Sequence, residues 1–170
     1  DYTLAKFLMR NPVFGLEMKT KIFFTPHVCL QLFESNQGLY EILLDGDPFA
    51  KSEGSELLDE AKELLRDYFN GDDADFSRLK LDFSGYTDFE RDVLKAVMKI
   101  PVGEVRSYKQ IAETVGRRRA YRAVGNAVAK NRTPIVIPCH RVIRSNGSIG
   151  NYGGGVRLKR LLLRHEGLLD

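Results

Sequence analysis

The pattern of hydrophobic residues changes along the first 70 residues of the chain, from short runs to a helical spacing. Hydrophobic runs at residues 21–25, 28–33 and 39–44 predict three β-strands, and Asn36-Gln37-Gly38 predicts a hairpin turn between the last two. Over residues 55–70 the spacing becomes helical, and Asn70-Gly71 should end that helix. The positions expected to be buried are Leu57, Leu58, Ala61, Leu64, Leu65 and Phe69. The first half therefore predicts a small β-rich unit with one helix.

The second half of the chain shows mostly helix and turn signals. The spacings Thr87–Glu90 and Ser107–Gln110 are typical of capping boxes, and each predicts the start of a helix. The second of these helices should end at Gly116, and a third should run to about Lys130. Two short helices joined by a tight glycine-containing turn predict a helix-turn-helix. A last helix should carry the leucines of residues 156–165.

The third predicted helix has small side chains around Arg122. Small residues are typical of close packing against another helix, and that interpretation stays open for part of this surface. Glycine, however, costs about 1 kcal/mol relative to alanine inside a helix. Arginine beside an alanine and glycine surface would let a helix approach a phosphate backbone closely, so nucleic-acid contact accounts better for the whole set. The small residues are Ala120, Ala123, Gly125, Ala127 and Ala129.

Two prolines enclose a β-branched run, Pro134-Ile135-Val136-Ile137-Pro138, directly before Cys139, His140 and Arg141. Proline fixes φ and favours extended geometry in its predecessor, so we expect a short, stiff, buried segment that places Cys139 and His140. A lone Cys-His pair is more often a core cysteine beside surface cations. After Arg141, Asn146-Gly147 predicts a turn. The glycines around Tyr152 predict a mobile segment that forms the wall of a site, where the backbone closely approaches another group.

The charges of the chain divide between its two halves. Residues 1–85 carry 9 Lys and Arg against 16 Asp and Glu, a net charge of −7, whereas residues 86–170 carry 17 against 7, a net charge of +10. This division suggests two modules, of which only the second suits a polyanion. At 170 residues the chain has room for one domain or two small ones. No hydrophobic run approaches the roughly 20 residues that span a bilayer.

The two cysteines lie in dissimilar contexts and suggest no disulfide, so we expect a reducing, intracellular compartment. His27 and Cys29 are two residues apart, as neighbours on one face of a strand would be. Two ligands fall short of the usual four of a structural zinc site, so a structural interpretation is preferred. Glu166 lies near a helix C-terminus, where an acidic group opposes the helix dipole and should have a partner.

With these elements assigned, the sequence resembles the O6-alkylguanine-DNA alkyltransferase family. The resemblance rests on Pro138-Cys139-His140-Arg141-Val142-Ile143, which matches the family signature around its acceptor cysteine. It extends without gaps over about residues 86–168, and over residues 1–85 it is only architectural. The other matching motifs are Gly103-Glu104-Val105-Arg106-Ser107-Tyr108, Arg122-Ala123-Val124-Gly125, Asn131, Gly150-Asn151-Tyr152 and His165-Glu166-Gly167.

The resemblance implies an α+β fold in two parts. Residues 1–83 would form a ribonuclease-H-like α/β subdomain. Residues 84–170 would form a mostly helical, winged-helix-like subdomain that contains the helix-turn-helix, binds DNA and carries the alkyltransferase site.

The resemblance also implies a single-turnover methyltransferase that accepts the alkyl group of O6-alkylguanine on Cys139. A free thiol needs a basic neighbour to become a nucleophile at neutral pH. In the family pattern Glu166 orients His140, which deprotonates Cys139 through a water, in the logic of a catalytic triad. Tyr108 would donate its hydroxyl to the departing guanine, and Asn131 would be a hinge between helix and active-site segment. The base pocket would comprise Tyr108, Val142, Tyr152, Gly153 and Gly154, with backbone groups of Cys139, Val142 and Gly153 contacting the base edge.

The implied partner is double-stranded DNA, bound in its minor groove without base-specific readout, and the target base must be flipped out of the stack. Arg122 would fill the vacated place. The implied DNA contacts are Tyr108, Arg118, Arg119, Arg122, Ala123, Gly125 and Arg141. No cofactor, metal or membrane is expected, and the protein should be a cytoplasmic, nucleoid-associated monomer, or a nuclear one in a eukaryote.

Two departures and two alternatives remain. Many members carry a polar residue at Gly153 and a tryptophan at Leu161, so the range of alkyl groups and activity on O4-alkylthymine stay open. Non-enzymatic relatives replace the acceptor cysteine, whereas Cys139 is present here. The alternatives to a transferase are a non-catalytic lesion sensor and a helix-turn-helix regulator, which would more usually be dimeric and read the major groove.

Overall fold

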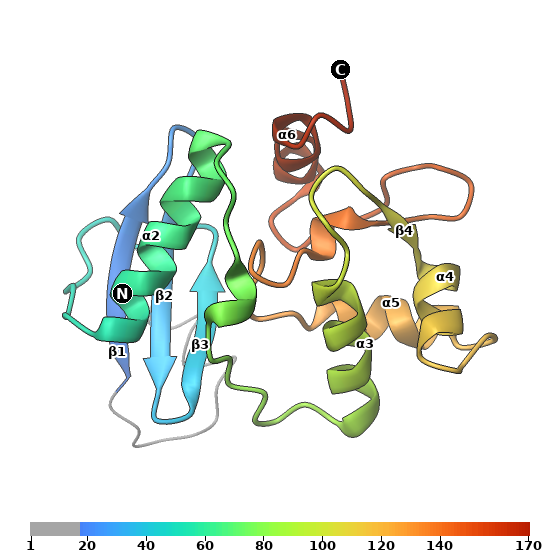
Figure 1. The fold of residues 1–170 in the computed structure, drawn as a ribbon, viewed down its shortest axis with the longest axis horizontal. Helices are drawn as coiled ribbons and strands as arrows, with labels where there is room; N and C mark the ends of the chain where they lie inside the picture. The colour runs from blue at the N-terminus through green and yellow to red at the C-terminus, as the bar shows by residue number, and fades with distance from the viewer. Residues whose placement is uncertain (1–17) are drawn as a thin grey trace. The chain divides into compact units, whose positions relative to one another are not determined.

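A computed structural model describes residues 18–170, and the chain divides into two compact units at Asp82 and Phe83. The first unit is built on a three-stranded antiparallel sheet of β1 (Lys19–Phe24), β2 (Cys29–Ser35) and β3 (Gly38–Leu43), in that order. These strands confirm the three predicted from the hydrophobic runs. The sheet order follows the chain because each strand returns beside its predecessor through a short turn (Figure 1).

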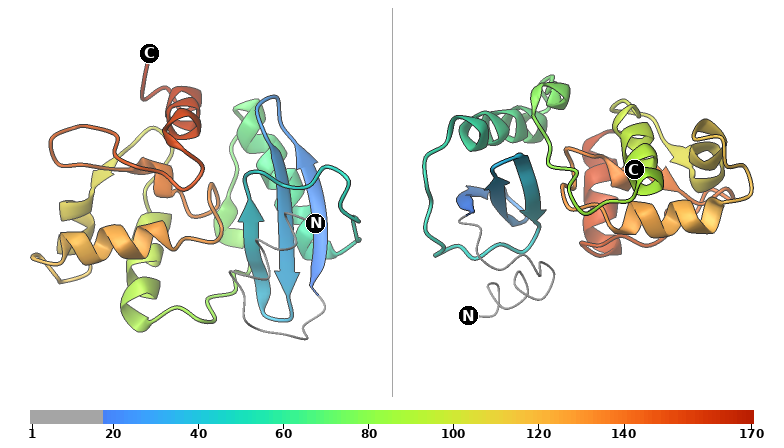
Figure 2. Two further views of the ribbon diagram at one scale, coloured as in Figure 1. Left: turned by 180° about the vertical axis from the view of Figure 1, so that it is seen from behind. Right: turned by 90° about the horizontal axis from the view of Figure 1, so that it is seen from below.

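Helix α2 (Glu56–Asn70) packs across the three strands and covers one face of the sheet (Figures 1 and 2). The Ser55 hydroxyl caps its first turn by accepting from the Leu58 N–H at 3.0 Å, and Gly71 ends it with a φ of +83°. Both ends are where the sequence predicts them. The buried stripe, which includes Leu58, Ala61 and Leu65, faces the sheet and forms the core of this unit. A short 3-10 turn, η1 (Phe76–Arg78), follows.

His27 lies in the turn between β1 and β2, not on a strand. The expectation that His27 and Cys29 are strand neighbours is therefore wrong, because β2 begins only at Cys29. Burial raises the pKa of the Cys29 thiol, with the carboxylate of Asp47 as the second cause. Cys29 is therefore a weakly ionised thiol at the start of the central strand.

The second unit packs α3 (Asp88–Met98), α4 (Tyr108–Thr114) and α5 (Tyr121–Ala129) against one another. Both predicted capping boxes form. Glu90 N–H donates to the Thr87 hydroxyl at 3.2 Å, and Gln110 N–H donates to the Ser107 hydroxyl at 3.1 Å. Helix α4 stops before Gly116, whose φ is +72°, so α4 and α5 form the expected helix-turn-helix.

Beyond α5 the chain forms the 3-10 turn η2 (Cys139–Arg141), strand β5 (Val142–Ile143) and helix α6 (Val156–His165). Strand β5 pairs in parallel with β4 (Arg106–Ser107), which leads directly into α4. Helix α6 packs on η2. The two-residue ladder and α6 therefore bring the start of α4 and the last helix of the unit to the segment that holds Cys139.

The segment 134–138 is buried throughout, as predicted, but it is not extended. It forms a tight turn in which the Ile137 N–H donates to the Thr133 carbonyl at 2.9 Å. Ile135 has a φ of +73°, a left-handed conformation that is strained for a β-branched side chain. Proline restricts the residues before it, but it does not restrict Ile135, which follows Pro134.

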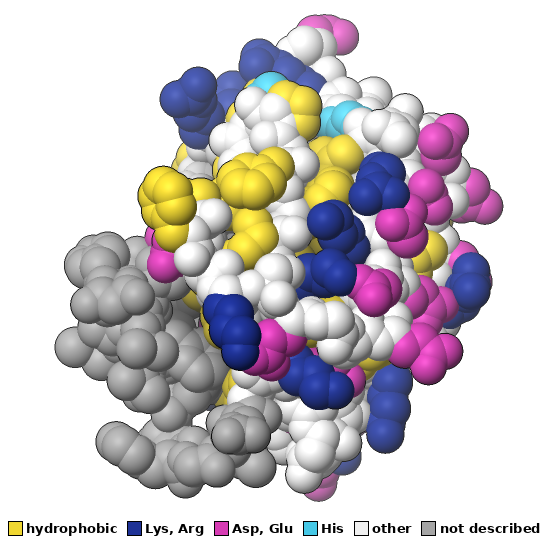
Figure 3. Space-filling view, turned by 90° about the vertical axis from the view of Figure 1, so that its left-hand side faces the viewer, with side chains coloured by type: hydrophobic (Ala, Val, Ile, Leu, Met, Phe, Trp, Pro, Cys, Tyr) yellow, Lys and Arg dark blue, Asp and Glu magenta, His cyan; other side chains and the backbone are white. Residues whose placement is uncertain are grey.

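The surface on the side of β1 and α2 carries interspersed cations and anions (Figure 3). Lysine and arginine lie next to aspartate and glutamate there, so this face presents no single-sign field of the kind that attracts a polyanion. Among the helices formed by residues 18–170, none combines the length and hydrophobicity that crossing a lipid bilayer requires.

Candidate active site

Cys139 begins the turn η2 and is only 8% exposed. Its backbone N–H donates to the Ile137 carbonyl at 2.8 Å, which closes the turn beneath it. The side-chain amide of Asn131 donates to the Cys139 sulfur at 3.1 Å and to the Ile137 carbonyl at 2.9 Å. The sulfur is therefore held against a hydrogen-bond donor at the end of a buried segment.

Asn131 is oriented by its own surroundings. Its side-chain oxygen accepts from the Thr133 N–H at 3.0 Å, so its nitrogen is the atom that faces the sulfur and the Ile137 carbonyl. This arrangement links the end of α5 to Cys139.

Opposing effects act on the ionisation of Cys139. Burial raises the pKa of the thiol above its usual value, and this is the larger effect. The amide of Asn131, the ammonium of Lys159 and the hydroxyl of Tyr152 all lower it. The site thus keeps a protonated thiol at rest while offering three groups that stabilise the thiolate once a base removes the proton.

His140 is fully buried, and its Nε2 lies 2.6 Å from Oε1 of Glu166. Burial lowers the pKa of His140, and this outweighs the opposite effect of the Glu166 carboxylate. A neutral imidazole must then donate from Nε2 to the carboxylate, which leaves a lone pair on Nδ1. Within residues 18–170, Nδ1 has no hydrogen-bond partner, so His140 is a buried base with its accepting atom available.

Glu166 has the partner that its position near a helix end required, and a second one besides. Arg141 donates from Nε to Oε2 and from Nη2 to Oε1, both at 2.9 Å. Burial acts to raise the pKa of Glu166, but the hydrogen bonds with His140 and Arg141 outweigh it and hold the pKa at about 2. The carboxylate is therefore ionised at any physiological pH.

The prediction that Arg141 contacts DNA is wrong. Arg141 is 5% exposed and donates from Nη1 to the Ile100 carbonyl at 2.6 Å, in addition to its bonds with Glu166. Its guanidinium forms three hydrogen bonds inside the protein, two of which fix the carboxylate that holds His140. The proximity of Arg141 to a DNA-binding motif along the sequence did not reveal this inward orientation.

Lys159 was missed by the sequence analysis. It is fully buried and donates from Nζ to the Val142 carbonyl at 2.7 Å and to the Asn151 carbonyl at 3.4 Å. Burial lowers its pKa to about 8, so the ammonium remains largely protonated at neutral pH beside the Cys139 sulfur. The signal was its position within α6, since Leu158 and Leu162 place Lys159 on the same inward stripe.

Tyr108 begins α4 and lies between two glycines. A Cβ at Gly125 would stand 3.9 Å from the Tyr108 ring, and one at Gly150 would stand 3.7 Å from its hydroxyl. Burial raises the pKa of Tyr108, and the nearby Cys139 acts in the same direction. The phenol therefore stays protonated, as a hydrogen-bond donor must. Part of the small-residue surface of α5 is thus explained by the tyrosine that it accommodates.

Some backbone groups of the predicted base pocket already form hydrogen bonds within the protein. The Val142 N–H donates to the Cys139 carbonyl, and the Val142 carbonyl accepts from Lys159. The only backbone capacity that Val142 can offer a base is the second lone pair of that carbonyl. Tyr152 is half-buried, whereas Gly153 and Gly154 are exposed. A Cβ at Gly153 would meet no atom within 4 Å.

Helix α5 presents the expected basic surface to solvent. Arg122 and Ala123 are exposed on its first turn, and Arg118 and Arg119 are exposed on the turn before it. Tyr121 is also 48% exposed, with the Arg122 guanidinium 6.0 Å from its ring centroid. Ala120 supplies no side-chain cap to the helix, so the first amides of α5 face this same basic region.

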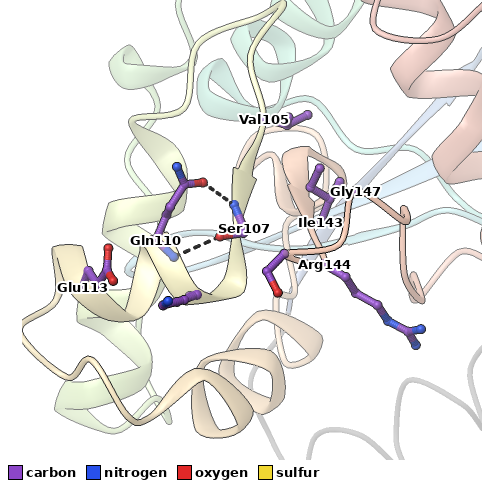
Figure 4. A pocket seen from close by; sticks show the side chains of 9 residues that line it. Val105, Ser107, Gln110, Glu113, Ile143, Arg144 and Gly147 are labelled. Atoms are coloured by element: carbon purple, nitrogen blue, oxygen red, sulfur yellow. Dashed lines mark hydrogen bonds between the residues drawn. The ribbon is translucent and has the colours of Figure 1, made fainter.

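A shallow pocket of about 370 Å³ lies beside α4 and β5 (Figure 4). Its wall includes Ser107 and Gln110, whose mutual capping bonds are drawn, together with Ile143, Arg144 and Gly147. Cys139 and His140 are not among the lining residues. This pocket is therefore separate from the cysteine site, which is enclosed in the present conformation.

Comparisons with known proteins identify the relatives of this chain. The family model described as "6-O-methylguanine DNA methyltransferase, DNA binding domain" matches residues 88–168. A methylated-DNA–protein-cysteine methyltransferase of Methanosarcina barkeri is 46% identical over 114 residues, which are 67% of this chain and 71% of that protein. The protein of the same name from Shigella flexneri is 49% identical over 107 residues, or 63% of this chain and 62% of its own length.

The fold agrees over a longer stretch than the sequence alignments. The crystal structure of Mycobacterium tuberculosis OGT in complex with DNA has a TM-score of 0.77 and 34% sequence identity, and the match covers 89% of this chain and 95% of that one. This agreement includes both units and supports the two-part α+β fold. The chain therefore belongs to the O6-alkylguanine-DNA alkyltransferase family, the methylated-DNA–protein-cysteine methyltransferases.

Proposed function

We propose that this protein repairs O6-alkylguanine in duplex DNA by transferring the alkyl group irreversibly to Cys139. The main support for the proposal is the set of buried hydrogen bonds that surrounds the Cys139 thiol and the neighbouring His140. The sulfur accepts a hydrogen bond from the Asn131 amide. The adjacent His140 is a neutral base that is hydrogen-bonded to the ionised carboxylate of Glu166. A binding module has no need of a buried nucleophile with a base and an orienting carboxylate.

The chemistry is a displacement at saturated carbon. His140 takes the Cys139 proton on Nδ1, through a water, while Glu166 stabilises the imidazolium that forms. The sulfur electron pair then forms a bond to the alkyl carbon as the bond from that carbon to guanine O6 breaks. The electron pair left on guanine is stabilised by a hydrogen bond from the Tyr108 hydroxyl. His140 then gives up the proton that it took from Cys139, so that guanine leaves in its neutral form and His140 becomes neutral again.

Each chain acts once because the product is a thioether. The carbon–sulfur bond of an alkyl thioether is broken neither by water nor by thiol exchange under physiological conditions, so Cys139 is not regenerated. Asn131 stabilises the thiolate through its hydrogen bond to the sulfur, and Lys159 stabilises it through its positive charge.

Duplex DNA is bound by the α4–α5 motif. Arg118, Arg119 and the open amides of α5 contact phosphates, and the small surface at Ala123 lets the helix enter the minor groove. Arg122 occupies the stack from which the target base is flipped. The base then enters between Tyr108 and the loop of residues 150–154, with O4-alkylthymine as a further candidate substrate. A cytoplasmic location, where Cys139 stays reduced, belongs to the same proposal.

The experiment offers an excess of duplex containing O6-methylguanine over protein and measures the lesion that remains. We expect repair to stop at one lesion per chain. A lesion sensor or a regulator, the alternatives of a different class, would bind the duplex and leave every lesion in place. Continued repair beyond one equivalent would refute the irreversible transfer.

A further inference from the structure

The hydroxyl of Tyr86 links the two peptide groups on either side of Asn131. It donates to the Lys130 carbonyl at 3.0 Å and accepts from the Arg132 N–H at 2.9 Å. Tyr86 lies just before α3, whereas Asn131 follows the end of α5, so the contact joins two segments 44 to 46 residues apart along the chain. Tyr86 belongs to none of the motifs that identify the family in this sequence.

The contact satisfies groups that the end of a helix leaves without partners. Lys130 is the C-cap of α5, and its carbonyl has no intrahelical donor. One hydroxyl can donate and accept at once, so Tyr86 bonds this carbonyl and the Arg132 amide together. The peptide groups before and after Asn131 are thereby fixed relative to α3.

Further contacts hold Tyr86 and its surroundings in place. The Arg132 guanidinium lies 4.3 Å from the centroid of the Tyr86 ring, a cation–π distance. Lys130 also forms an ion pair with Glu90, the residue that completes the capping box of α3. Helices α3 and α5 pack against each other, so both contacts connect rigid elements.

The position of Asn131 has a direct consequence for the sulfur. Its side-chain nitrogen is shared between the Cys139 sulfur and the Ile137 carbonyl. The intervening turn contains the strained Ile135, so a loosened anchor at Asn131 would let this turn relax toward an ordinary conformation. A shift of the amide away from the sulfur would remove a donor that stabilises the thiolate.

We propose that Tyr86 is a positioning residue for alkyl transfer: its hydroxyl fixes the backbone on both sides of Asn131 and so keeps the Asn131 amide against the Cys139 sulfur. The inference rests on Cys139 as the acceptor. It assigns Tyr86 no contact with DNA or with the alkyl group.

Tyr86→Phe removes the hydroxyl and keeps the ring that Arg132 covers. All variants are made with Cys29→Ser, so that Cys139 is the only thiol. We expect transfer from free O6-benzylguanine to slow about 3- to 10-fold at neutral pH, because the hydrogen bond from the Asn131 amide to the Cys139 sulfur would be weakened and not lost. The midpoint of the pH–rate profile should move to higher pH, and the ultraviolet titration of the thiolate should move with it.

Three comparisons make the result specific. Tyr68→Phe, the same change within α2 of the first unit, should leave rate and pH profile unchanged. Asn131→Ala should slow transfer more than Tyr86→Phe does, and adding Tyr86→Phe to it should have no further effect. Lys159, His140, Tyr108 and Tyr152, the other titratable groups that face or adjoin Cys139, are unchanged in every variant.

The proposal is overturned if the pH midpoint of Tyr86→Phe is unchanged, whether or not its free energy of unfolding is lower. Tyr86 would then have a structural role only. Effects of Tyr86→Phe and Asn131→Ala that simply add would also overturn it, because Tyr86 would then act by another route. Absence of any transfer in the parent protein would refute the proposed function instead. The thiolate titration would still report whether Tyr86 acts on Cys139.

Discussion

Arg141 binds both carboxylate oxygens of Glu166, with its Nε and Nη2 each 2.9 Å from an oxygen. The same carboxylate holds His140, so a single acidic side chain at the end of α6 joins the base to a buried cation. Arg141 follows His140 directly in the chain, and both point to Glu166 from the turn η2. The geometry of the base is therefore determined by a contact that also closes the fold.

Replacing Arg141 should destabilise the protein. Arg141→Ala leaves the Glu166 carboxylate with one partner fewer and the Ile100 carbonyl unpaired in the interior. Breaking a buried pair in this way costs about 3–5 kcal/mol, which urea unfolding would measure. Arg157→Ala, an exposed arginine of α6, is the control and should change stability by less than about 0.5 kcal/mol. A stable Arg141→Ala that binds duplex with a weaker salt dependence would instead restore Arg141 as a DNA contact.

Glu166→Gln should impair activation of the thiol. The amide keeps the shape of the carboxylate but removes the charge that raises the pKa of His140. His140 becomes a weaker base, so transfer at neutral pH should slow by roughly 100-fold or more, in the range of general-base effects. Stopped-flow measurement with free O6-benzylguanine should show the rate recovering only at higher pH. A profile identical to that of the parent protein would contradict the role of Glu166.

Local elements were predictable from the sequence because their causes are local. The capping boxes at Thr87 and Ser107 and the glycine at 71 determine helix ends through residues three or four positions away. The roles of Arg141, Lys159 and Tyr86 depend instead on partners 17 to 46 residues distant. Arg141 and Lys159 have charged side chains, which are usually solvated. The leucine stripe of α6 hints at the inward position of Lys159, but nothing near Arg141 in the sequence does so for Arg141.

The proximity of Cys139, His140 and Glu166 was expected only because the motifs resemble a family. From residue types alone, a buried cysteine next to a histidine had a more ordinary explanation. The left-handed Ile135 could not be predicted either, since β-branched residues disfavour that conformation and only the surrounding contacts impose it.

Acidification should destabilise the fold in two stages. His140 has a folded-state pKa below its unfolded value, so its contribution is present above about pH 6.5 and declines as the pH falls below it. Glu166 has a folded pKa of about 2, against about 4.3 unfolded, so its contribution declines as the pH falls from about 4.3 toward 2. Urea midpoints from pH 8 to 3 should fall accordingly. In Glu166→Gln the lower stage should shrink to the part contributed by other carboxylates whose pKa is also lowered, such as Glu90. A lower stage of unchanged size would show that Glu166 contributes nothing to it.

Arg122→Ala should separate base flipping from chemistry. Arg122 is exposed on α5, so its removal should leave the cysteine site intact. The flipped state would lose its replacement in the stack, a loss of a few kcal/mol, and transfer from duplex should slow strongly. Transfer from free O6-benzylguanine should hardly change. Arg118→Ala should instead weaken duplex binding and reduce its salt dependence, with little effect at saturating DNA. Equal slowing on free base and duplex would place Arg122 in the pocket or the fold.

Intact-protein mass spectrometry after mixing with duplex containing O6-methylguanine tests the central claim most directly. We predict that each chain gains the mass of one methylene, and that peptide mapping places the added methyl group on Cys139. Cys139→Ala should gain nothing while still binding the duplex. Methylation of Cys29, or bound duplex with no added mass on the parent protein, would contradict Cys139 as the alkyl acceptor.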